Sequence, residues 1–290
     1  MIIVVVGPTG VGKTKMSVEL AKYYNAEIIN ADSMQFYKGL DIGTAKVTES
    51  EKEGIPHHLF DIKEVEDIYT VYDYQKDGRK MIKELSDKGK NIVIVGGTGL
   101  YIKALLYDYT FKEENELNTY DDLTNLEIYN KISKYEECDI HINNRKRLIR
   151  RLNKLENDLM LEETGNNKLY DFIMIGLTTD RDTLYKKIDD RVDKMVDDGL
   201  IEEVKSFYDK NIRSKAINTG IGYKELYKYF DKEISLEEAI DLIKKNSRHY
   251  AKRQYTFFKN KFDNIKWFNT DYNNFNNTVS EVIEYINKKN

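Results

Sequence analysis

The chain has 290 residues, of which 40% are hydrophobic and 33% are charged, with a formal net charge of −4. No stretch reaches the roughly 18 apolar residues of a membrane helix. The net charge also excludes a uniformly basic protein, so any polyanion must bind to local positive patches. An apolar run follows Met1 directly, without a basic leader, and Cys138 is the single cysteine. We therefore expect a cytoplasmic protein that binds no membrane.

The first motif is a phosphate-binding loop behind a buried strand. Residues 2–6 are all apolar. The pattern G-x-x-x-x-G-K-[ST] then follows in Gly7, Pro8, Thr9, Gly10, Val11, Gly12, Lys13 and Thr14. Such a loop directs backbone N–H groups at an anion, and the helix expected over 15–22 adds its positive N-terminal end. Lys13 supplies a mobile charge and Thr14 a hydroxyl that can hold Mg²⁺, so a phosphate-bearing ligand is predicted.

A second buried strand is expected over residues 26–33, with Asp32 at its end. Functional groups collect at the carboxyl ends of parallel strands, which would bring Asp32 close to the phosphate loop. A helix N-cap or turn role for Asp32 remains an alternative. The loop that follows carries polar and apolar groups in Ser33, Met34 and Gln35.

The segment between the second and third strands is predicted to be mainly structural. His57 and His58 have no third ligand at metal spacing, which favours a structural or substrate-contact role over a metal site. Apolar residues at helical spacing predict a helix over 69–85. The third core strand is expected over 91–95.

The turn after the third strand is informative for what it lacks. A nucleotide hydrolase of this architecture usually has an acidic residue at the end of such a strand, to organise Mg²⁺ and water. Here the strand is followed by Gly96, Gly97 and Thr98. This favours a phosphate-bearing ligand that is not simply hydrolysed, although a hydrolase with its acid on another strand stays possible at this point.

The middle of the chain changes from acidic to basic. Residues 111–139 are polar and acidic and predict short helices inserted at the edge of the sheet. On a helix after residue 145, Arg147, Arg150 and Arg151 share one face, and Leu148 and Leu152 belong to an opposite apolar stripe. The basic face is either a solvated surface or a nucleic-acid contact.

The last 120 residues return to core elements. A strand is expected over 171–177, followed by a helix capped near Asp180 and a second helix over 200–208. Arg191 falls off the apolar stripe of the first of these helices. A long helix over 235–258 interleaves basic and aromatic residues and carries Arg248, Lys252 and Arg253. This pattern suits phosphate contact plus stacking, or else an amphipathic helix with a hydrated face.

These elements predict an α/β fold: a P-loop NTPase-like parallel sheet flanked by helices, with a small helical insertion domain. The core would comprise residues 1–110 and 171–290, and the insertion residues 111–170. A last strand over 265–268 and a closing helix over 279–286 complete the core.

Taken together, the motifs resemble the tRNA dimethylallyltransferase (tRNA isopentenyltransferase) family. The segments that carry the resemblance are residues 7–14, 30–35, 37–46, 56–61, 96–101, 221–225 and 248–254. The resemblance implies transfer of a dimethylallyl group from its diphosphate to N6 of the adenosine 3′-adjacent to the anticodon in tRNA, with release of diphosphate. It also implies Mg²⁺ as cofactor, and we expect a monomer.

The resemblance also implies roles for single residues. Lys13, the rest of the phosphate loop and Arg191 would bind the diphosphate, with Mg²⁺ near Thr14. Asp32 would orient the adenine amine and accept its proton, and Thr98 would hold the adenosine. Contacts with tRNA are expected from Ser33, Met34, Gln35, Lys146, Arg147, Leu148, Ile149, Arg150, Arg248, Lys252 and Arg253. The 111–170 insertion would then clamp the anticodon arm.

Two other functions compete with this one. A small-molecule kinase or a prenyltransferase of free adenylate would share the loop, but the two basic patches favour a polynucleotide. A nucleotide-binding regulator without transfer chemistry would tolerate Asp32→Ala.

Overall fold

The computed structural model describes residues 1–111, 118–156 and 166–289, so parts of the predicted 111–170 insertion lie outside the described residues. The chain forms two compact units. The larger combines Met1–Leu106 with Leu169–Asn290, and the smaller is Tyr107–Lys168.

The larger unit is built on one parallel sheet in the order β3-β2-β4-β1-β5-β6. Its strands are β1 (Ile2–Val6), β2 (Ala26–Asn30), β3 (His57–His58), β4 (Asn91–Val95), β5 (Ile173–Thr178) and β6 (Ile265–Asn269). Every neighbouring pair is parallel, with Val5 opposite Val95 on one side and Ile175 on the other. All five β1 residues are buried, as their apolar run predicts for a central strand covered on both faces.

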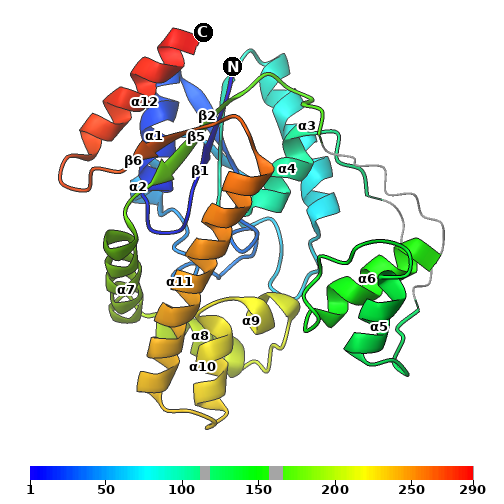
Figure 1. Cartoon of the computed structure of the whole chain (residues 1–290). Helices are drawn as coiled ribbons and strands as arrows, with labels where there is room; N and C mark the ends of the chain where they lie inside the picture. Colours follow the sequence, from blue (N-terminus) through cyan, green and yellow to red (C-terminus); the bar gives the residue numbers. More distant parts are fainter. Residues whose placement is uncertain (112–117, 157–165, 290) are drawn as a thin grey trace. The chain divides into compact units, whose positions relative to one another are not determined.

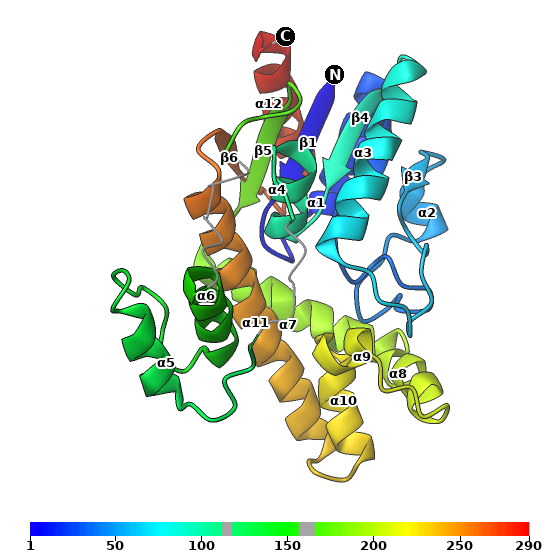
Figure 2. The same cartoon turned by 90° about the vertical axis from the view of Figure 1, so that its right-hand side faces the viewer.

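Helices cover both faces of the sheet (Figure 1 and Figure 2). One face packs against α1 (Lys13–Tyr24) and α12 (Phe275–Lys289), and the other against α3 (Val71–Asp87) and α4 (Gly99–Leu106). Ile3 and Val5 lie in the same buried cluster as Met16 of α1 and Val282 of α12. Because successive side chains along β1 point to opposite faces of the sheet, the strand packs against the helices on both faces.

A further group of helices in the larger unit lies toward the carboxyl ends of the strands, in the lower part of Figure 1. They are α7 (Arg181–Asp197), α8 (Leu200–Tyr208), α9 (Lys215–Thr219), α10 (Tyr223–Phe230) and α11 (Leu236–Lys261), and a short α2 (Glu49–Lys52) precedes β3. Within the described residues, no helix is both long and apolar enough to span a bilayer.

The smaller unit contains α5 (Asn125–Ile132) and α6 (Arg145–Glu156). Its own core gathers Ile128, Ile132, Cys138, Leu148 and Leu152. This apolar stripe of α6 was predicted from its spacing.

The predicted parallel α/β sheet flanked by helices is confirmed, and the predicted strands and helices occur in the predicted order along the chain. One local prediction was wrong, and two short elements were missed. The second strand ends at Asn30 rather than at Asp32, because the chain turns where the Asn30 side chain accepts the Asp32 N–H at 2.8 Å. The two-residue β3 and the five-residue α9 were not predicted, since neither is long enough to show a period.

Candidate active site

The phosphate loop joins β1 to α1 through backbone that favours glycine. Gly12 caps α1 with φ 85°, a left-handed conformation that glycine adopts without strain. A Cβ at Gly12 would also approach the Phe275 ring to 2.7 Å. The first N–H groups of α1 have no partner within the helix, so this end of α1 is open to an anion.

Distant parts of the chain hold the phosphate loop in place. The Thr9 N–H donates to Gln254 Oε1 at 2.8 Å, the Tyr272 hydroxyl donates to the Gly10 carbonyl at 3.0 Å, and the Thr270 hydroxyl donates to the Val11 carbonyl at 3.0 Å. These contacts leave the loop little freedom to rearrange.

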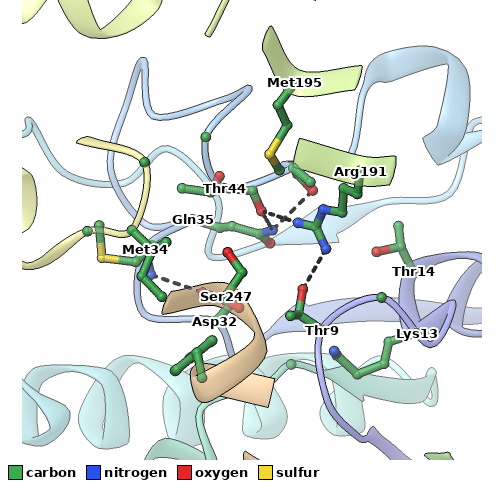
Figure 3. A pocket seen from close by; sticks show the side chains of 18 of the residues that line it. Thr9, Lys13, Thr14, Asp32, Met34, Gln35, Thr44, Arg191, Met195 and Ser247 are labelled. Carbon is green, nitrogen blue, oxygen red and sulfur yellow. Dashed lines mark hydrogen bonds between the residues drawn. The ribbon is translucent and has the colours of Figure 1, made fainter. Parts of the chain in front are cut away.

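Two cations lie beside the loop (Figure 3). Lys13 Nζ donates to the Pro8 carbonyl at 2.8 Å. Arg191 donates from Nη1 to Thr9 Oγ1 at 2.5 Å and from Nη2 to the Thr44 carbonyl at 3.4 Å. Burial, opposed by Asp32 and reinforced by Arg191, lowers the pKa of Lys13 to about 8. Crowding two cations at one end of a cavity creates a site for an anion.

Asp32 follows β2 and faces the same cavity. The Met34 N–H donates to Asp32 Oδ1 at 3.1 Å, which fixes the carboxylate. Burial raises the pKa of Asp32, while the Met34 N–H, Lys13 and Arg191 oppose the rise. A partly desolvated carboxylate with a raised pKa accepts a proton more readily than an exposed one.

Thr98 connects the ends of β2 and β4. Its Oγ1 accepts the Ser33 N–H at 3.2 Å, and its own N–H donates to the Ala31 carbonyl at 3.3 Å. At Gly97 a Cβ would lie 2.1 Å from Gln254 Nε2, so a larger residue would displace the Gln254 side chain. The turn at residues 96–98, which follows β4, bears no acidic side chain.

A cavity of about 510 Å³ joins the phosphate loop, Arg191 and Asp32. The predicted site residues that line it are Thr9, Gly10, Gly12, Lys13, Thr14, Asp32, Ser33, Met34, Gln35, Arg191 and Arg253. Val192, Met195 and Ile243 add an apolar portion. Gly7, Pro8, Val11, Thr98, Arg248 and Lys252 are not among the lining residues, and Val11 is fully buried in the core.

The predicted RNA-contact residues divide by exposure. Lys146, Arg147 and Arg150 are exposed on α6, whereas Ile149 is partly buried. Leu148 is fully buried in the core of the smaller unit, so its predicted contact with RNA is corrected. It occupies the apolar stripe that holds α6 to α5.

The basic residues of α11 have different surroundings. Lys252 and Arg253 are exposed. Arg248 Nη1 instead donates to both carboxylate oxygens of Asp189, at 2.5 and 2.7 Å, so Arg248 fastens α11 to α7. An RNA phosphate would have to compete with that ion pair.

Neither histidine of the pair at 57–58 lies in a metal cluster. His58 Nε2 lies 2.7 Å from Glu27 Oε2, and His57 Nδ1 lies 2.8 Å from the Ile55 carbonyl. Among the residues that the structure describes, no group of three or more His, Cys, Asp or Glu could hold a metal ion. These contacts tie both rings to their neighbours, and His57 also lines the cavity described above, so a structural or a substrate-contact role stays the prediction.

Sequence inspection did not identify several contributors to the site. Gln254 links the phosphate loop to the turn at Gly97, because its Nε2 donates to the Gly97 carbonyl at 3.0 Å. Tyr250 and Ser247, one and two turns earlier on α11, line the cavity. The sequence signal for Tyr250 and Gln254 was their place in the 248–254 segment of the resemblance, whereas Ser247 had only its position on the same basic and aromatic helix.

Comparison with known proteins agrees with this architecture. A family model described as IPP transferase matches residues 35–261. A tRNA dimethylallyltransferase of Anoxybacillus flavithermus is 46% identical, over 99% of this chain and 96% of that protein.

Solved structures lead to the same family. The tRNA isopentenylpyrophosphate transferase of Bacillus halodurans superposes with a TM-score of 0.77 at 40% identity, over 99% of this chain and 96% of that one. A eukaryotic dimethylallyltransferase described as acting on tRNA superposes with a TM-score of 0.81 at 28% identity, over 97% of this chain and 77% of that one. The chain therefore belongs to the tRNA dimethylallyltransferase family.

Proposed function

We propose that this protein transfers a dimethylallyl group from dimethylallyl diphosphate to N6 of the adenosine 3′-adjacent to the anticodon in tRNA. The products are N6-dimethylallyladenosine and diphosphate. The observation that carries the proposal is one cavity lined by both the phosphate loop with its cations and the Asp32 carboxylate. We call the two ends of this cavity the diphosphate end (the phosphate loop, residues 7–14, and Arg191) and the base end (residues 32–35, supported from behind by Thr98).

At the diphosphate end, Lys13, Arg191 and the N-terminal N–H groups of α1 stabilise the departing diphosphate. The C–O bond of the allylic ester breaks, and the electron pair leaves with the diphosphate. Fixed cations and dipoles aimed at that developing charge lower the barrier without reorganising during the reaction. The apolar portion around Val192 and Met195 suits the five-carbon chain.

The donor set at this end fits Mg²⁺. Thr14 is exposed at the start of α1 and offers a hydroxyl oxygen, and Mg²⁺ is commonly held by few protein oxygens together with substrate phosphates. Mg²⁺ would neutralise charge on the leaving diphosphate. Thr14 is the residue we propose to hold it.

At the base end, Asp32 acts as general base. The adenine N6 lone pair is delocalised into the ring, so a carboxylate that hydrogen-bonds the amine orients it and takes its proton as the C–N bond forms. Thr98 keeps the backbone of Ser33 in place through its hydrogen bond. Ser33, Met34 and Gln35 line the pocket for the adenine, which must leave its stack to enter.

The tRNA is bound by exposed cations, of which Arg253 lies at the cavity and the others outside its lining. We assign phosphate contacts to Lys146, Arg147 and Arg150 in the insertion, which acts as a clamp for the anticodon arm, and to Lys252 and Arg253 on α11. Arg248 joins them only where RNA displaces its pairing with Asp189. We propose that the protein works as a monomer in the cytoplasm.

The test is incubation with dimethylallyl diphosphate, Mg²⁺ and unmodified tRNA, followed by nucleoside analysis. The expected product is N6-dimethylallyladenosine at the position 3′ to the anticodon. Parallel reactions with AMP as acceptor, and with ATP plus small acceptors, separate the adenylate prenyltransferase and kinase alternatives. Modification of AMP alone, or phosphoryl transfer without prenylation, would overturn the proposal.

A further inference from the structure

A carboxylate outside the cavity holds one of the cavity walls. Glu203 on α8 accepts three consecutive backbone N–H groups: those of Asp41 and Ile42 at Oε2, at 3.1 and 2.7 Å, and that of Gly43 at Oε1, at 3.1 Å. The Tyr223 hydroxyl also donates to Oε1, at 2.6 Å. Successive N–H groups that converge in this way form an anion-binding nest, and here the chain supplies the anion itself.

The segment held by Glu203 continues into the site. Gly43, Thr44 and Ala45 line the cavity, while Glu203 is not among the lining residues. The Thr44 carbonyl accepts from Arg191 at 3.4 Å, and the Gln35 side-chain amide donates to the carbonyls of Thr44 at 3.1 Å and Ala45 at 3.3 Å. Displacing residues 43–45 would therefore move one side chain from each end of the cavity (Figure 3).

Gly43 packs closely against Tyr223 of α10. A Cβ at Gly43 would meet ring atoms of Tyr223 at 2.7 Å, and Tyr223 is fully buried. Burial beside Glu203 raises the pKa of Tyr223 well above its usual range, so its hydroxyl remains a donor throughout the physiological range.

The segment has a second anchor that does not involve Glu203. Lys46 Nζ donates to Asp41 Oδ1 at 2.6 Å, to Asp61 Oδ1 at 2.5 Å and to the Tyr37 carbonyl at 2.8 Å. The Thr44 hydroxyl also donates to the Leu40 carbonyl at 2.6 Å. Loss of the Glu203 carboxylate should thus shift the segment without unfolding it.

We propose that Glu203 is a positioning residue, which sets Arg191 and Gln35 in their reactive places by clamping residues 41–43. The inference rests on the proposed function. Displacements of about 1 Å within an active site can cost up to about a hundredfold in rate, so a remote clamp of this kind has a measurable effect.

The test compares Glu203→Gln with Glu202→Gln, a neighbouring exposed glutamate on the same helix. In Glu203→Gln, the new side-chain N–H₂ group faces backbone N–H donors and cannot accept from them. We expect kcat/KM for dimethylallyl diphosphate to fall by about tenfold. The Kd for tRNA should stay within about twofold, because backbone phosphate contacts dominate it. Glu202→Gln should match the unsubstituted protein in every parameter.

Either of two results would overturn the inference. In the first, the tRNA affinity and the thermal midpoint of Glu203→Gln fall in proportion to its activity. In the second, its kinetics equal those of Glu202→Gln. If Glu203→Gln does not fold, Tyr223→Phe decides, because it removes one of the four donors and leaves the carboxylate. That variant should show the same selective loss at smaller size, and unchanged kinetics would count against the clamp.

Binding of inorganic diphosphate, measured by calorimetry, separates the two proposals. Weaker diphosphate binding by Glu203→Gln in a protein that forms no prenylated tRNA would refute the proposed function and leave the clamp standing. Prenylation by the unsubstituted protein, with equal diphosphate binding and equal kinetics in both glutamine variants, would refute the clamp alone.

Discussion

The two ends of the cavity are built differently. The diphosphate end uses one continuous segment, residues 7–14, whose glycines and helix start are local features; only Arg191 comes from elsewhere. The base end is assembled from β2, β4 and the turns after them, joined by the hydrogen bond from the Ser33 N–H to Thr98. Anion binding can thus be encoded in a short motif, whereas the base pocket depends on the whole sheet.

The largest effect is expected at the base end. Asp32→Asn keeps the shape of the side chain but removes the proton acceptor, so kcat should fall by about a thousandfold. Binding of dimethylallyl diphosphate should change little, because the phosphate loop is intact. Steady-state kinetics and diphosphate calorimetry check both parts.

Near-normal turnover in Asp32→Asn would remove the assignment of the general base. The pH profile gives a second check. Because burial raises the pKa of Asp32, the rate should fall as the pH drops through a range above that of an ordinary aspartate. The asparagine variant should lack this acidic limb.

At the diphosphate end, Lys13→Met should lower kcat/KM for dimethylallyl diphosphate by about a hundredfold. With the Lys13 pKa at about 8, the ammonium is charged below that pH and attracts the diphosphate. The kcat/KM of the unsubstituted protein should therefore decline as the pH rises above 8. Lys13→Arg, which stays charged, should not show that decline.

Persistence of the alkaline decline in Lys13→Arg would show that another group titrates there. A comparable loss of tRNA binding in Lys13→Met would contradict the separation of the two ends.

Gln254 connects the ends, and its removal should affect both. Gln254→Ala leaves the Thr9 N–H and the Gly97 carbonyl without this partner, so we expect about a tenfold fall in kcat and a stability loss of about 1–3 kcal/mol. Gln254→Glu is the matched control, since it keeps an acceptor for Thr9 and loses only the donor to Gly97. Urea unfolding and kinetics measure the two effects.

The smallest effect is expected in the insertion. Replacing Lys146 and Arg147 with alanine should weaken tRNA binding several-fold and reduce the slope of log Kd against log salt by about one per lost phosphate contact. Lys289→Ala, at the end of α12, is the control with a distant charge. A slope unchanged by the double substitution would exclude α6 from the RNA-binding surface.

Much of the fold followed from local patterns. The strands at 2–6 and 91–95 were predicted with their observed bounds, and the cap of α7 at Asp180 was also predicted. Periodicity and capping depend on residues close together in the chain, so they can be recognised from the sequence. The strand order is not local, and neither is the end of β2, which a side-chain contact of Asn30 determines.

The site was predictable to the extent that its residues stand in motifs. Lys13, Asp32 and Arg191 do line one cavity. The clamp by Glu203 and the bridge by Gln254 join residues about 160 and 245 positions apart, which no spacing rule connects. Leu148 illustrates the opposite error. An RNA contact was predicted for it because it lies in a basic stretch, although it belongs to the apolar stripe.

The most direct test of the central claim is a crystal structure with an anticodon stem-loop and an unreactive thio analogue of dimethylallyl diphosphate. The account predicts the diphosphate against the start of α1, between Lys13 and Arg191, with the flipped adenine N6 in hydrogen-bond contact with the Asp32 carboxylate. A diphosphate bound elsewhere, or an adenine kept away from Asp32 by the cavity walls, would contradict it.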